Sequence, residues 1–254
     1  MWDPQRYLVF GDERARPFHD LMAVVDAPDP AEVVDLGCGP GNLTATLAQR
    51  WPAARVVGVD SSVAMVAAAR GVHGIEVVHA DLREWTPDRP VDVLVSNATL
   101  QWVPDHIALV PKLVDVLAPG GWFAFQVPAN FSEPSHVLLR QLADSPRWRD
   151  RIGGERVARP SSHEPDEYLA VLVGLDCAVQ IWETTYFHVL HGQDAVLDWI
   201  TGTALRPILA VLDQAERAEF TSEYGALLRT AYPRRSYGTV LPYRRIFAVA
   251  QRHI

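Results

Sequence analysis

The chain has 254 residues, enough to bury one large core, and its 48% hydrophobic and 21% charged residues are typical of a soluble globular protein. The formal net charge of −8 provides no global basic field, which excludes nucleic acid as the expected partner. Two cysteines, Cys38 and Cys177, suggest neither a disulfide framework nor a metal site. Residues 1–20 lack a secretory signal, and no apolar run approaches the roughly 18 residues of a membrane span. We therefore expect a cytoplasmic protein that does not enter a membrane.

The first 30 residues precede the first expected strand. Residues 2–10 are too aromatic for a disordered tail, and residues 12–25 have helical periodicity. The apolar stripe of this helix consists of Phe18, Leu21, Met22 and Val25. Two interpretations stay open here, a packing helix with solvated charges or a lid over a cofactor cleft. The side chains that such a lid would supply are Tyr7, Arg14 and Arg16.

An apolar, β-branched run at 33–36 leads into a glycine loop and then into a helical pattern at 42–51. Strand, tight turn and helix make the first half of a βαβ unit. Glycine lacks a Cβ, so the loop can take positive φ and approach a ligand closely, while Asn42 is expected to cap the helix. The three loop glycines are Gly37, Gly39 and Gly41.

The ligand of this loop is predicted from Asp35 and Asn42. A dinucleotide fingerprint has a third glycine where Asn42 stands, and Asp35 would repel a pyrophosphate. A carboxylate suits a cationic ligand that carries an amino group and a sulfonium. The segment DLGCGPGN at 35–42 resembles motif I of the class I S-adenosylmethionine (AdoMet) methyltransferases. That resemblance implies AdoMet as the cofactor.

Three further apolar runs, at 55–60, 75–80 and 91–96, end at or just before polar residues. Because open α/β sheets bind ligands at the carboxyl ends of their strands, Asp60 is expected to bind the ribose hydroxyls. The family resemblance implies that Asp81 and Leu82 bind adenine and that Asn97 lies beside the reactive methyl. The full expected cofactor set is Asp35, Gly37, Cys38, Gly39, Gly41, Asp60, Ser61, Met65, Asp81, Leu82, Asn97, Ala98 and Trp102.

The remaining elements follow from periodicity. A helix is expected to start at Ser61-Ser62, with Val63, Val66 and Ala67 on its buried face and Met65 on its inner side. Further helices are expected at 106–117, 195–201 and 206–232, the first ending at the Pro119-Gly120-Gly121 stop. Strands are expected at 122–127, 178–189 and 243–252. Between them, 128–176 is polar and rich in arginine, either a substrate-side insertion or a solvated face.

Motifs outside the cofactor-binding half resemble the trans-aconitate methyltransferases. They are WDPxxYLxFxDERxRP at 2–17, WxxGTxLRP at 199–207 and LPxRR at 241–245. The resemblance extends over nearly the whole chain. It implies an α/β Rossmann-like fold with a seven-stranded, mostly parallel sheet, helices on both faces and helical substrate-side additions. It also implies that the last strand is antiparallel and inserts between the fifth and the sixth.

We expect one methyltransferase domain over 1–254, with a lid or helix at 1–30, a cofactor-binding half at 31–128, and the substrate-side insertion and last two strands at 129–254. The family esterifies a carboxylate of trans-aconitate, a small polycarboxylate. Such a substrate needs several cationic or hydroxyl donors. The candidates for binding it are Tyr7, Arg14, Arg16, Trp199, Thr203, Arg206, Tyr232 and Arg244.

The expected reaction needs no catalytic base. A carboxylic acid has a pKa of about 4, so the acceptor oxygen is already anionic at neutral pH. In-line methyl transfer then depends on positioning and on the attraction of the sulfonium for the carboxylate. The histidines that could be considered as bases are better interpreted as structural: His19, His106, His188 and His191.

Two other functions stay open at this stage. The acceptor could be another small carboxylate, or a carbon or phenolic oxygen, and the last two would need a base. The chain could also be a non-catalytic AdoMet-binding module acting through a partner, although the set of Asp35, Asp60, Asp81 and Asn97 argues against a decayed site.

Overall fold

The structure is a computed structural model that describes residues 11–152 and 161–254, with side chains from Ala15 onward. The described residues form two compact units. The sheet unit takes in those of 1–127, 163–184 and 245–254, and the helical unit those of 128–162 and 185–244. The two long strands β6 (Cys177–Leu190) and β7 (Thr239–Arg252) contribute to both units. Tyr7, one of the expected lid residues, lies outside the described residues, as do the side chain of Arg14 and residues 153–160 of the arginine-rich stretch 128–176.

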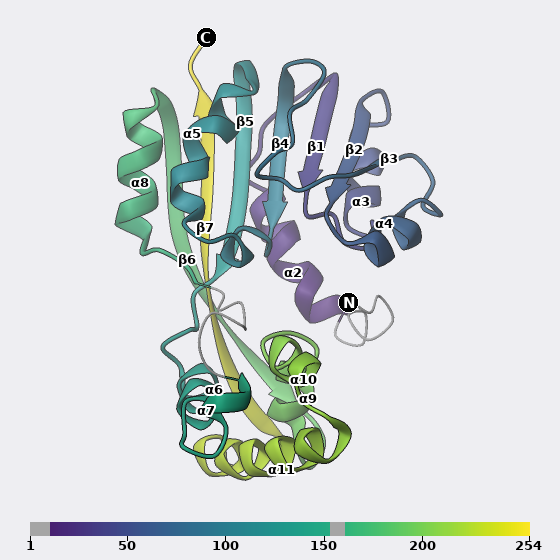
Figure 1. The fold of residues 1–254 in the computed structure, drawn as a ribbon. Helices are drawn as coiled ribbons and strands as arrows, with labels where there is room; N and C mark the ends of the chain where they lie inside the picture. The colour runs from purple at the N-terminus through teal and green to yellow at the C-terminus, as the bar shows by residue number, and fades with distance from the viewer. Residues whose placement is uncertain (1–10, 153–160) are drawn as a thin grey trace. The chain divides into compact units, whose positions relative to one another are not determined.

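A seven-stranded sheet has the order β3-β2-β1-β4-β5-β7-β6 (Figure 1). β1 pairs in parallel with β2 and β4, β2 with β3, and β4 with β5, whereas β7 runs antiparallel. This confirms the predicted insertion of the last strand between the fifth and the sixth. The other strands are β1 (Glu32–Leu36), β2 (Arg55–Asp60), β3 (Glu76–His79), β4 (Val91–Asn97) and β5 (Leu117–Pro128).

The central strands are apolar because both of their faces are covered. All five residues of β1 are buried, and Val93, Leu94 and Val95 of β4 are fully buried. Figure 1 shows α5 (Val110–Asp115) and α8 (Pro165–Gly174) on one face of the sheet and α3 (Thr44–Arg50) on the other. A strand that is covered on both faces has a continuous hydrophobic sequence. The positions of these strands could therefore be predicted from the sequence.

The helix α2 (Gly11–Met22) confirms the predicted apolar stripe, since Phe18, Leu21 and Met22 are buried, as is Val25 just beyond its end. The helix α4 (Val63–Ala69) starts where expected, with Ser62 accepting a hydrogen bond from Met65 N.

The predicted buried face of α4 is only partly right. Met65, Val66 and Ala69 are buried, whereas Val63 is 68% exposed and Ala67 is also exposed. With 3.6 residues per turn, Val63 and Ala67 share a face about 100–200° from the stripe of Met65 and Ala69, so both face solvent.

The segment after β4 differs from the predicted helix at 106–117. A 3-10 helix, η3 (His106–Leu109), runs into the short α5, and the Pro119-Gly120-Gly121 stop lies inside β5. The register with β4 jumps from Val91↔Leu117 to Val93↔Trp122, so the extra residues form an irregularity in the strand. Gly120 has φ +77°, a conformation that glycine adopts without strain.

The start of β7 lies four residues earlier than predicted. Thr239, Leu241 and Tyr243 are buried and alternate with half-buried Val240 and Pro242, which is the period of a strand. The predicted strand began only after Pro242, because proline is rare inside strands. β6 differs from its expected span by one residue at each end.

The helical unit contains α6 (Pro134–Ala143), α7 (Arg149–Ile152), α9 (Ala195–Thr201), α10 (Arg206–Val211) and α11 (Gln214–Ala231). The single helix predicted at 206–232 is therefore wrong. Asp213 is extended (ψ 178°), and its carboxylate accepts a hydrogen bond from Glu216 N in a capping box that starts α11. The Asp-x-x-Glu spacing at 213–216 is typical of a helix N-terminus and indicates that a new helix begins there.

The insertion expected at 128–176 is shorter than its polar composition suggested. Residues 163–184 belong to the sheet unit, and α8 packs there against α5. The hydroxyl of Tyr168 on α8 lies 2.6 Å from His106 Nε2, and the two rings stack. α8 is mainly apolar and carries no arginine, so the arginine-rich part of 128–176 ends before it.

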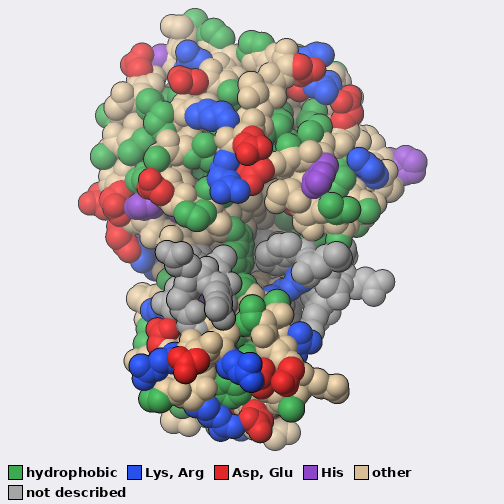
Figure 2. Space-filling view, viewed as in Figure 1, with side chains coloured by type: hydrophobic (Ala, Val, Ile, Leu, Met, Phe, Trp, Pro, Cys, Tyr) green, Lys and Arg blue, Asp and Glu red, His purple; other side chains and the backbone are tan. Residues whose placement is uncertain are grey.

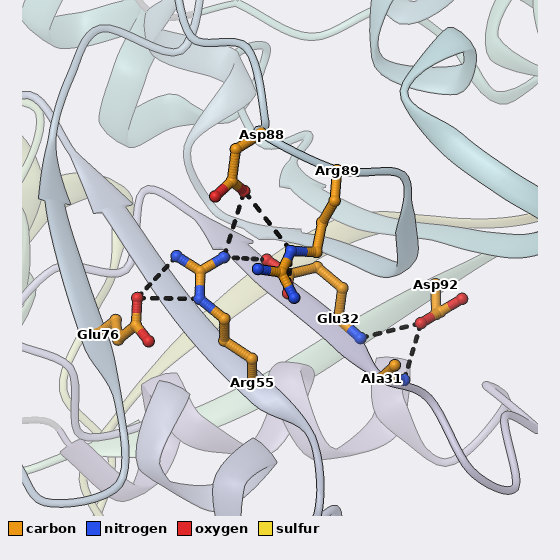
Figure 3. Close-up of polar contacts among 7 residues, drawn as sticks. All are labelled: Ala31, Glu32, Arg55, Glu76, Asp88, Arg89 and Asp92. Atoms are coloured by element: carbon orange, nitrogen blue, oxygen red, sulfur yellow. Dashed lines mark hydrogen bonds and ion pairs between the residues drawn. The ribbon is translucent and has the colours of Figure 1, made fainter.

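At the amino ends of the strands, a network of charged side chains joins β1, β2 and β3 (Figure 3). Arg55 lies 2.6 Å from Glu32, 2.7 Å from Glu76 and 3.3 Å from Asp88. Glu32 is only 2% exposed, and its burial raises the pKa of its carboxyl against the opposing effect of Arg55. Asp92 accepts hydrogen bonds from two successive backbone amides at the start of β1. These contacts hold the strands in register at the edge away from the glycine loop.

On the face shown in Figure 2, acidic and basic side chains are interspersed over both units. Among the described helices, none is long and apolar enough to span a membrane.

Candidate active site

The glycine loop after β1 is held against the end of β2. The backbone N–H groups of Gly37 and Cys38 both donate to Val59 O, at 2.7 and 3.1 Å. Gly37 has φ +81°, and a Cβ there would lie 2.0 Å from Thr99 Oγ1, so this glycine is required by packing. Gly39 also has positive φ (+56°), but a Cβ there would meet no atom within 4 Å. Gly39 is thus the position where a ligand can approach the backbone of the loop.

Gly41 and Cys38 pack inward. A Cβ on Gly41 would lie 3.0 Å from Ile75, and Cys38 is buried with its Sγ against Gly58 of β2. A Cβ on Gly58 would lie 2.9 Å from that sulfur, so the strand needs glycine there. The sequence reading missed Gly58, although a glycine in a β-branched strand signals close approach. Burial, together with Asp35 and Asp60, raises the pKa of the Cys38 thiol, which therefore stays neutral.

Asp35 is 3% exposed, and its Oδ2 accepts a hydrogen bond of 2.6 Å from Thr44 Oγ1. Within the described part of the chain, no hydrogen bond reaches its other oxygen, Oδ1. Burial raises the pKa of this carboxyl to about 6, against the lowering effect of Thr44. At neutral pH the group is mostly ionised, so the site holds a buried negative charge, and one of its oxygens has no hydrogen-bond donor among the described residues. A ligand with an ammonium group and a sulfonium fits this arrangement.

Asn42 does not cap the next helix as predicted. It is exposed, and α3 begins at Thr44 with Leu43 in the N-cap position and no side-chain cap. The hydroxyl of Thr44 is instead committed to Asp35. Thr44 is a second residue that the sequence reading missed.

Asp60, at the end of β2, joins the glycine loop to α4. Its Oδ2 accepts from Gly39 N at 3.0 Å, and its Oδ1 accepts from Ser62 N at 2.7 Å. Each oxygen keeps lone pairs that ribose hydroxyls can use. Ser61 is exposed at the same turn, whereas Met65, on α4, is buried (3% exposed).

Asp81 and Leu82 follow β3 at the same edge of the sheet. Arg83 binds Asp81 with its guanidinium, at 3.0 Å (Nε to Oδ1) and 2.5 Å (Nη2 to Oδ2), and with its backbone N–H at 2.9 Å. The Arg83 side chain lowers the pKa of Asp81, which keeps the carboxylate ionised. Leu82 is buried. An adenine amine would share Asp81 with Arg83, a partner that the sequence reading did not identify.

The end of β4 is a tight turn. Ala98 has φ +53°, which is unusual for a residue with a Cβ, and its N–H donates to Gln126 O at 3.0 Å. Gln101 Nε2 donates to Ala98 O at 2.6 Å, and Asn97 Oδ1 accepts from Gln126 Nε2 at 2.7 Å. Trp102, on η2 (Leu100–Trp102), is half-buried. The turn is therefore held in a strained conformation at the edge where the other cofactor candidates lie.

All thirteen predicted cofactor residues belong to the sheet unit. The loop glycines, Asp35, Asp60, Asp81 and Asn97 lie at the carboxyl ends of β1 to β4, which are adjacent in the order β3-β2-β1-β4. Hydrogen bonds join the loop directly to Asp60, and through Thr99 to the turn after β4. Of the described residues, no group of three His, Cys, Asp or Glu side chains is placed to hold a metal ion.

The predicted substrate residues are more dispersed. In the sheet unit, Arg16 has a side chain that is 71% exposed, with Asp20 at 3.9 Å. The other described candidates lie in the helical unit: Trp199, Thr203, Arg206, Tyr232 and Arg244. Trp199 is buried and packs against His188, with ring centroids 4.7 Å apart, and against Tyr243 at 5.7 Å.

The hydroxyls among these candidates have local hydrogen bonds. Tyr232 OH accepts from Ser135 N at the start of α6, at 3.0 Å, and Thr203 Oγ1 donates to Ile200 O at 3.3 Å. Arg206 and Arg244 are half-buried.

Two arginines of the insertion pair with α11. Arg147 binds Glu219 and, at 2.6 Å, Glu223, and Arg151 lies 3.0 Å from Glu216. These exposed ion pairs favour the solvated-face interpretation for this part of the insertion.

The candidate histidine bases are mostly structural. His106 is fully buried, and burial and His163 lower its pKa to about 4. His188 is buried among aromatic rings, whereas His19 and His191 are exposed. His136, which the sequence reading did not consider, is buried with a pKa lowered to about 4 by burial.

Comparison with known proteins shows strong similarity over the whole chain. A family described as "methyltransferase domain" matches residues 33–121. Trans-aconitate 2-methyltransferase of Streptomyces avermitilis is 52% identical over 260 residues, covering 99% of this chain and 97% of that protein. The protein of the same name from Rhodococcus jostii is 50% identical over 254 residues and is covered to 99%, as is this chain.

Two solved structures share the fold. The YcgJ protein of Bacillus subtilis aligns with a TM-score of 0.59 at 17% identity, covering 93% of this chain and 99% of that one. An S-adenosylmethionine-dependent methyltransferase of Mesorhizobium loti aligns with a TM-score of 0.55 at 21% identity, covering 96% and 100%. At such identities the comparison supports the architecture alone, whereas the curated relatives extend the likeness to both units.

Proposed function

This chain belongs to the trans-aconitate 2-methyltransferase family, and from that premise we propose that it transfers the methyl group of AdoMet to a carboxylate oxygen of trans-aconitate. The observation that carries the proposal is identity of about 50% over 99% of the chain, because it includes the helical unit as well as the cofactor-binding half. We further propose that the protein is cytoplasmic and acts on a small molecule rather than on nucleic acid. Both cysteines are free and buried, and the net charge is −8, in agreement with these expectations.

When bound, AdoMet supplies a methyl group activated on a cationic sulfur. Each residue proposed to hold AdoMet binds a different part of the cofactor. Asp35 offers a buried carboxylate to the cationic part, Asp60 accepts hydrogen bonds from the ribose hydroxyls, and Asp81 accepts one from the adenine amine. Gly39 leaves room for the ligand beside the loop backbone.

The acceptor side needs orientation rather than a base. A carboxylic acid with a pKa of about 4 is an anion at neutral pH and attacks without losing a proton. His106 and His136 are buried, and their pKa values of about 4 make both weak bases, so we assign neither of them that role. We propose that Tyr7, Arg14, Arg16, Trp199, Thr203, Arg206, Tyr232 and Arg244 hold the substrate, and that residues 1–30 act as a lid in a single functional domain.

The proposal is tested by turnover with AdoMet and trans-aconitate, beside cis-aconitate, isocitrate and citrate, following S-adenosylhomocysteine and the product mass. We expect a methyl ester formed preferentially from trans-aconitate, with a rate that is flat between about pH 6 and 8 because no base titrates there. AdoMet binding without turnover of any acid would overturn the assignment and favour another acceptor or a binding module. A rate that falls steeply below about pH 6 would indicate an acceptor that needs a base.

The substrate role of Arg206 has a matched control in Arg217, an exposed arginine on α11. We expect Arg206→Ala to raise KM for trans-aconitate at least about tenfold, as loss of a charge-assisted hydrogen bond does, with the AdoMet Kd unchanged. Arg217→Ala should leave both constants unchanged. A loss of AdoMet affinity in Arg206→Ala would assign that arginine to the cofactor instead.

A further inference from the structure

A buried chain of three polar side chains crosses the sheet to the end of β4. Arg245 Nη1, on β7, donates to Gln126 Oε1 on β5 at 3.0 Å. Gln126 Nε2 in turn donates to Asn97 Oδ1 on β4 at 2.7 Å. Arg245 is 4% exposed and Gln126 is fully buried, whereas Asn97 is partly exposed at the edge of the sheet. Asn97 and Gln126 are also direct register partners, so their side chains share a face.

The direction of these hydrogen bonds is set by Arg245. A guanidinium has donors and no acceptor, so Gln126 must turn its carbonyl oxygen toward Arg245 and its amide nitrogen toward Asn97. Asn97 must then accept with Oδ1, which turns its own NH2 group to the other side. The reversed arrangement would place the N–H groups of Gln126 against the guanidinium. Within the described residues, no hydrogen bond takes up Asn97 Nδ2.

We propose that Arg245, acting through Gln126, is a positioning residue that fixes Asn97 as a hydrogen-bond donor to the acceptor carboxylate. This inference rests on the proposed function, since it concerns the acceptor of that reaction. An anionic carboxylate needs donors, whereas an amine or hydroxyl acceptor carries a proton and needs a lone pair. The polarity of one carboxamide therefore selects the anionic class of acceptor.

The discriminating variant is Gln126→Glu, which is nearly isosteric. A glutamate carboxylate accepts hydrogen bonds from both neighbours, so Arg245 keeps its partner while Asn97 must turn its NH2 group toward position 126. The carbonyl oxygen of Asn97 then faces the acceptor. The matched control is Gln251→Glu, the same change on β7 at a half-buried glutamine whose Nε2 donates to Gly120 O.

Two measurements on these variants test the inference. Calorimetric titration of trans-aconitate into the protein loaded with S-adenosylhomocysteine gives acceptor binding without turnover. We expect Gln126→Glu to raise this Kd and to lower kcat/KM by about 10- to 100-fold, the usual worth of one hydrogen bond to a charged group. The Kd of AdoMet should stay within about threefold of wild type in both variants.

The second measurement reports the amide directly. The chain has three asparagines, Asn42, Asn97 and Asn130, so selective ¹⁵N-asparagine labelling yields three carboxamide signals. In Gln126→Glu, the Asn97 NH2 becomes hydrogen-bonded inside the protein, and its exchange with water should slow while the other two signals stay unchanged. Gln251→Glu should leave all three unchanged.

Unchanged exchange of the Asn97 carboxamide in Gln126→Glu would overturn the inference, as would a slowed exchange with unchanged trans-aconitate affinity. Should Gln126→Glu fail to fold, Gln126→Met breaks the chain without a new charge, and we expect an intermediate loss of acceptor affinity. An unaltered affinity in Gln126→Met would also count against the inference. If the wild type itself does not methylate trans-aconitate, the proposed function fails, while the NMR comparison still decides whether Gln126 sets the orientation of Asn97.

Discussion

Replacing Asp35 by asparagine should make the ligand-free protein more stable while weakening its hold on AdoMet. The carboxyl has a pKa of about 6 in the folded protein against an ordinary value of 3.8, a difference of about 2 units caused mainly by burial. At 1.36 kcal/mol per unit, the folded protein spends about 3 kcal/mol at neutral pH to keep this charge buried. Asparagine removes that cost but leaves an amide N–H at the position of Oδ1 without a partner, worth about 1–2 kcal/mol. The expected net gain is about 1–2 kcal/mol.

The pH dependence gives the sharper test. Between about pH 4 and 6 the folded state holds a proton on Asp35 that the unfolded state has released, so the stability of the wild type falls as pH rises through this interval. Above about pH 7 this contribution is constant. The stability of the wild type relative to Asp35→Asn should therefore drop by about 2 kcal/mol from pH 4.5 to pH 7.5.

Urea unfolding of both proteins at a series of pH values measures this difference in the free energy of unfolding. The Kd of AdoMet measures what the charge of Asp35 contributes to cofactor binding. We expect the AdoMet Kd of Asp35→Asn to rise at least about tenfold. The control is Asp115→Asn, the same change at an exposed carboxylate in the last turn of α5, which should alter stability by less than about 0.5 kcal/mol. A stability difference between wild type and Asp35→Asn that does not vary with pH would refute the reasoning.

Three further substitutions and one control test the packing of the glycine loop, the approach of the ligand to it, and the charged network around Arg55. Gly37→Ala should cost about 3 kcal/mol, because its Cβ would overlap Thr99. Gly39→Ala should cost only about 1–2 kcal/mol, from its positive φ alone, yet bind AdoMet at least about tenfold more weakly. Equal AdoMet affinity in the folded Gly39→Ala protein would contradict this. Arg55→Met should lower the free energy of unfolding by about 2–3 kcal/mol, because Arg89, at 3.8 Å, would be the one cation left beside Glu32 among the described residues. The control Arg89→Met should cost less than about 1 kcal/mol in the same urea titration.

The sequence predicted where the candidate cofactor residues lie in the fold. The strands of the sheet unit are buried on both faces, so they stand out as apolar runs, and the residues that follow them must meet at one edge of a parallel sheet. Asp35 and Asp60 became cofactor candidates in this way, because each closes or nearly closes such a run. Positive φ at Gly37 and Gly39 was likewise expected from a tight turn between strand and helix.

Periodicity and residue type gave wrong bounds or wrong buried faces where the surroundings of a helix or strand decide its length or its neighbours. Pro242 concealed the first residues of β7, although their alternation was present. The acidic start of α11 at Asp213 was overlooked inside an apparently continuous helical pattern. Val63 and Ala67 were assigned to the buried face of α4, since periodicity over a seven-residue helix defines a stripe only loosely.

The hydrogen bonds that shape the site were decided by the tertiary structure. Asn97 and Gln126 are 29 residues apart, and Gln126 and Arg245 are 119 apart. They meet because β7 inserts beside β5 and because β4 and β5 adopt one particular register. Period and composition determine which side of an element is buried, but they carry no information on which strand will lie opposite. The amino-acid sequence alone therefore determined the carboxylates and glycines that suit AdoMet, whereas strand order and register decided how the amide of Asn97 is turned.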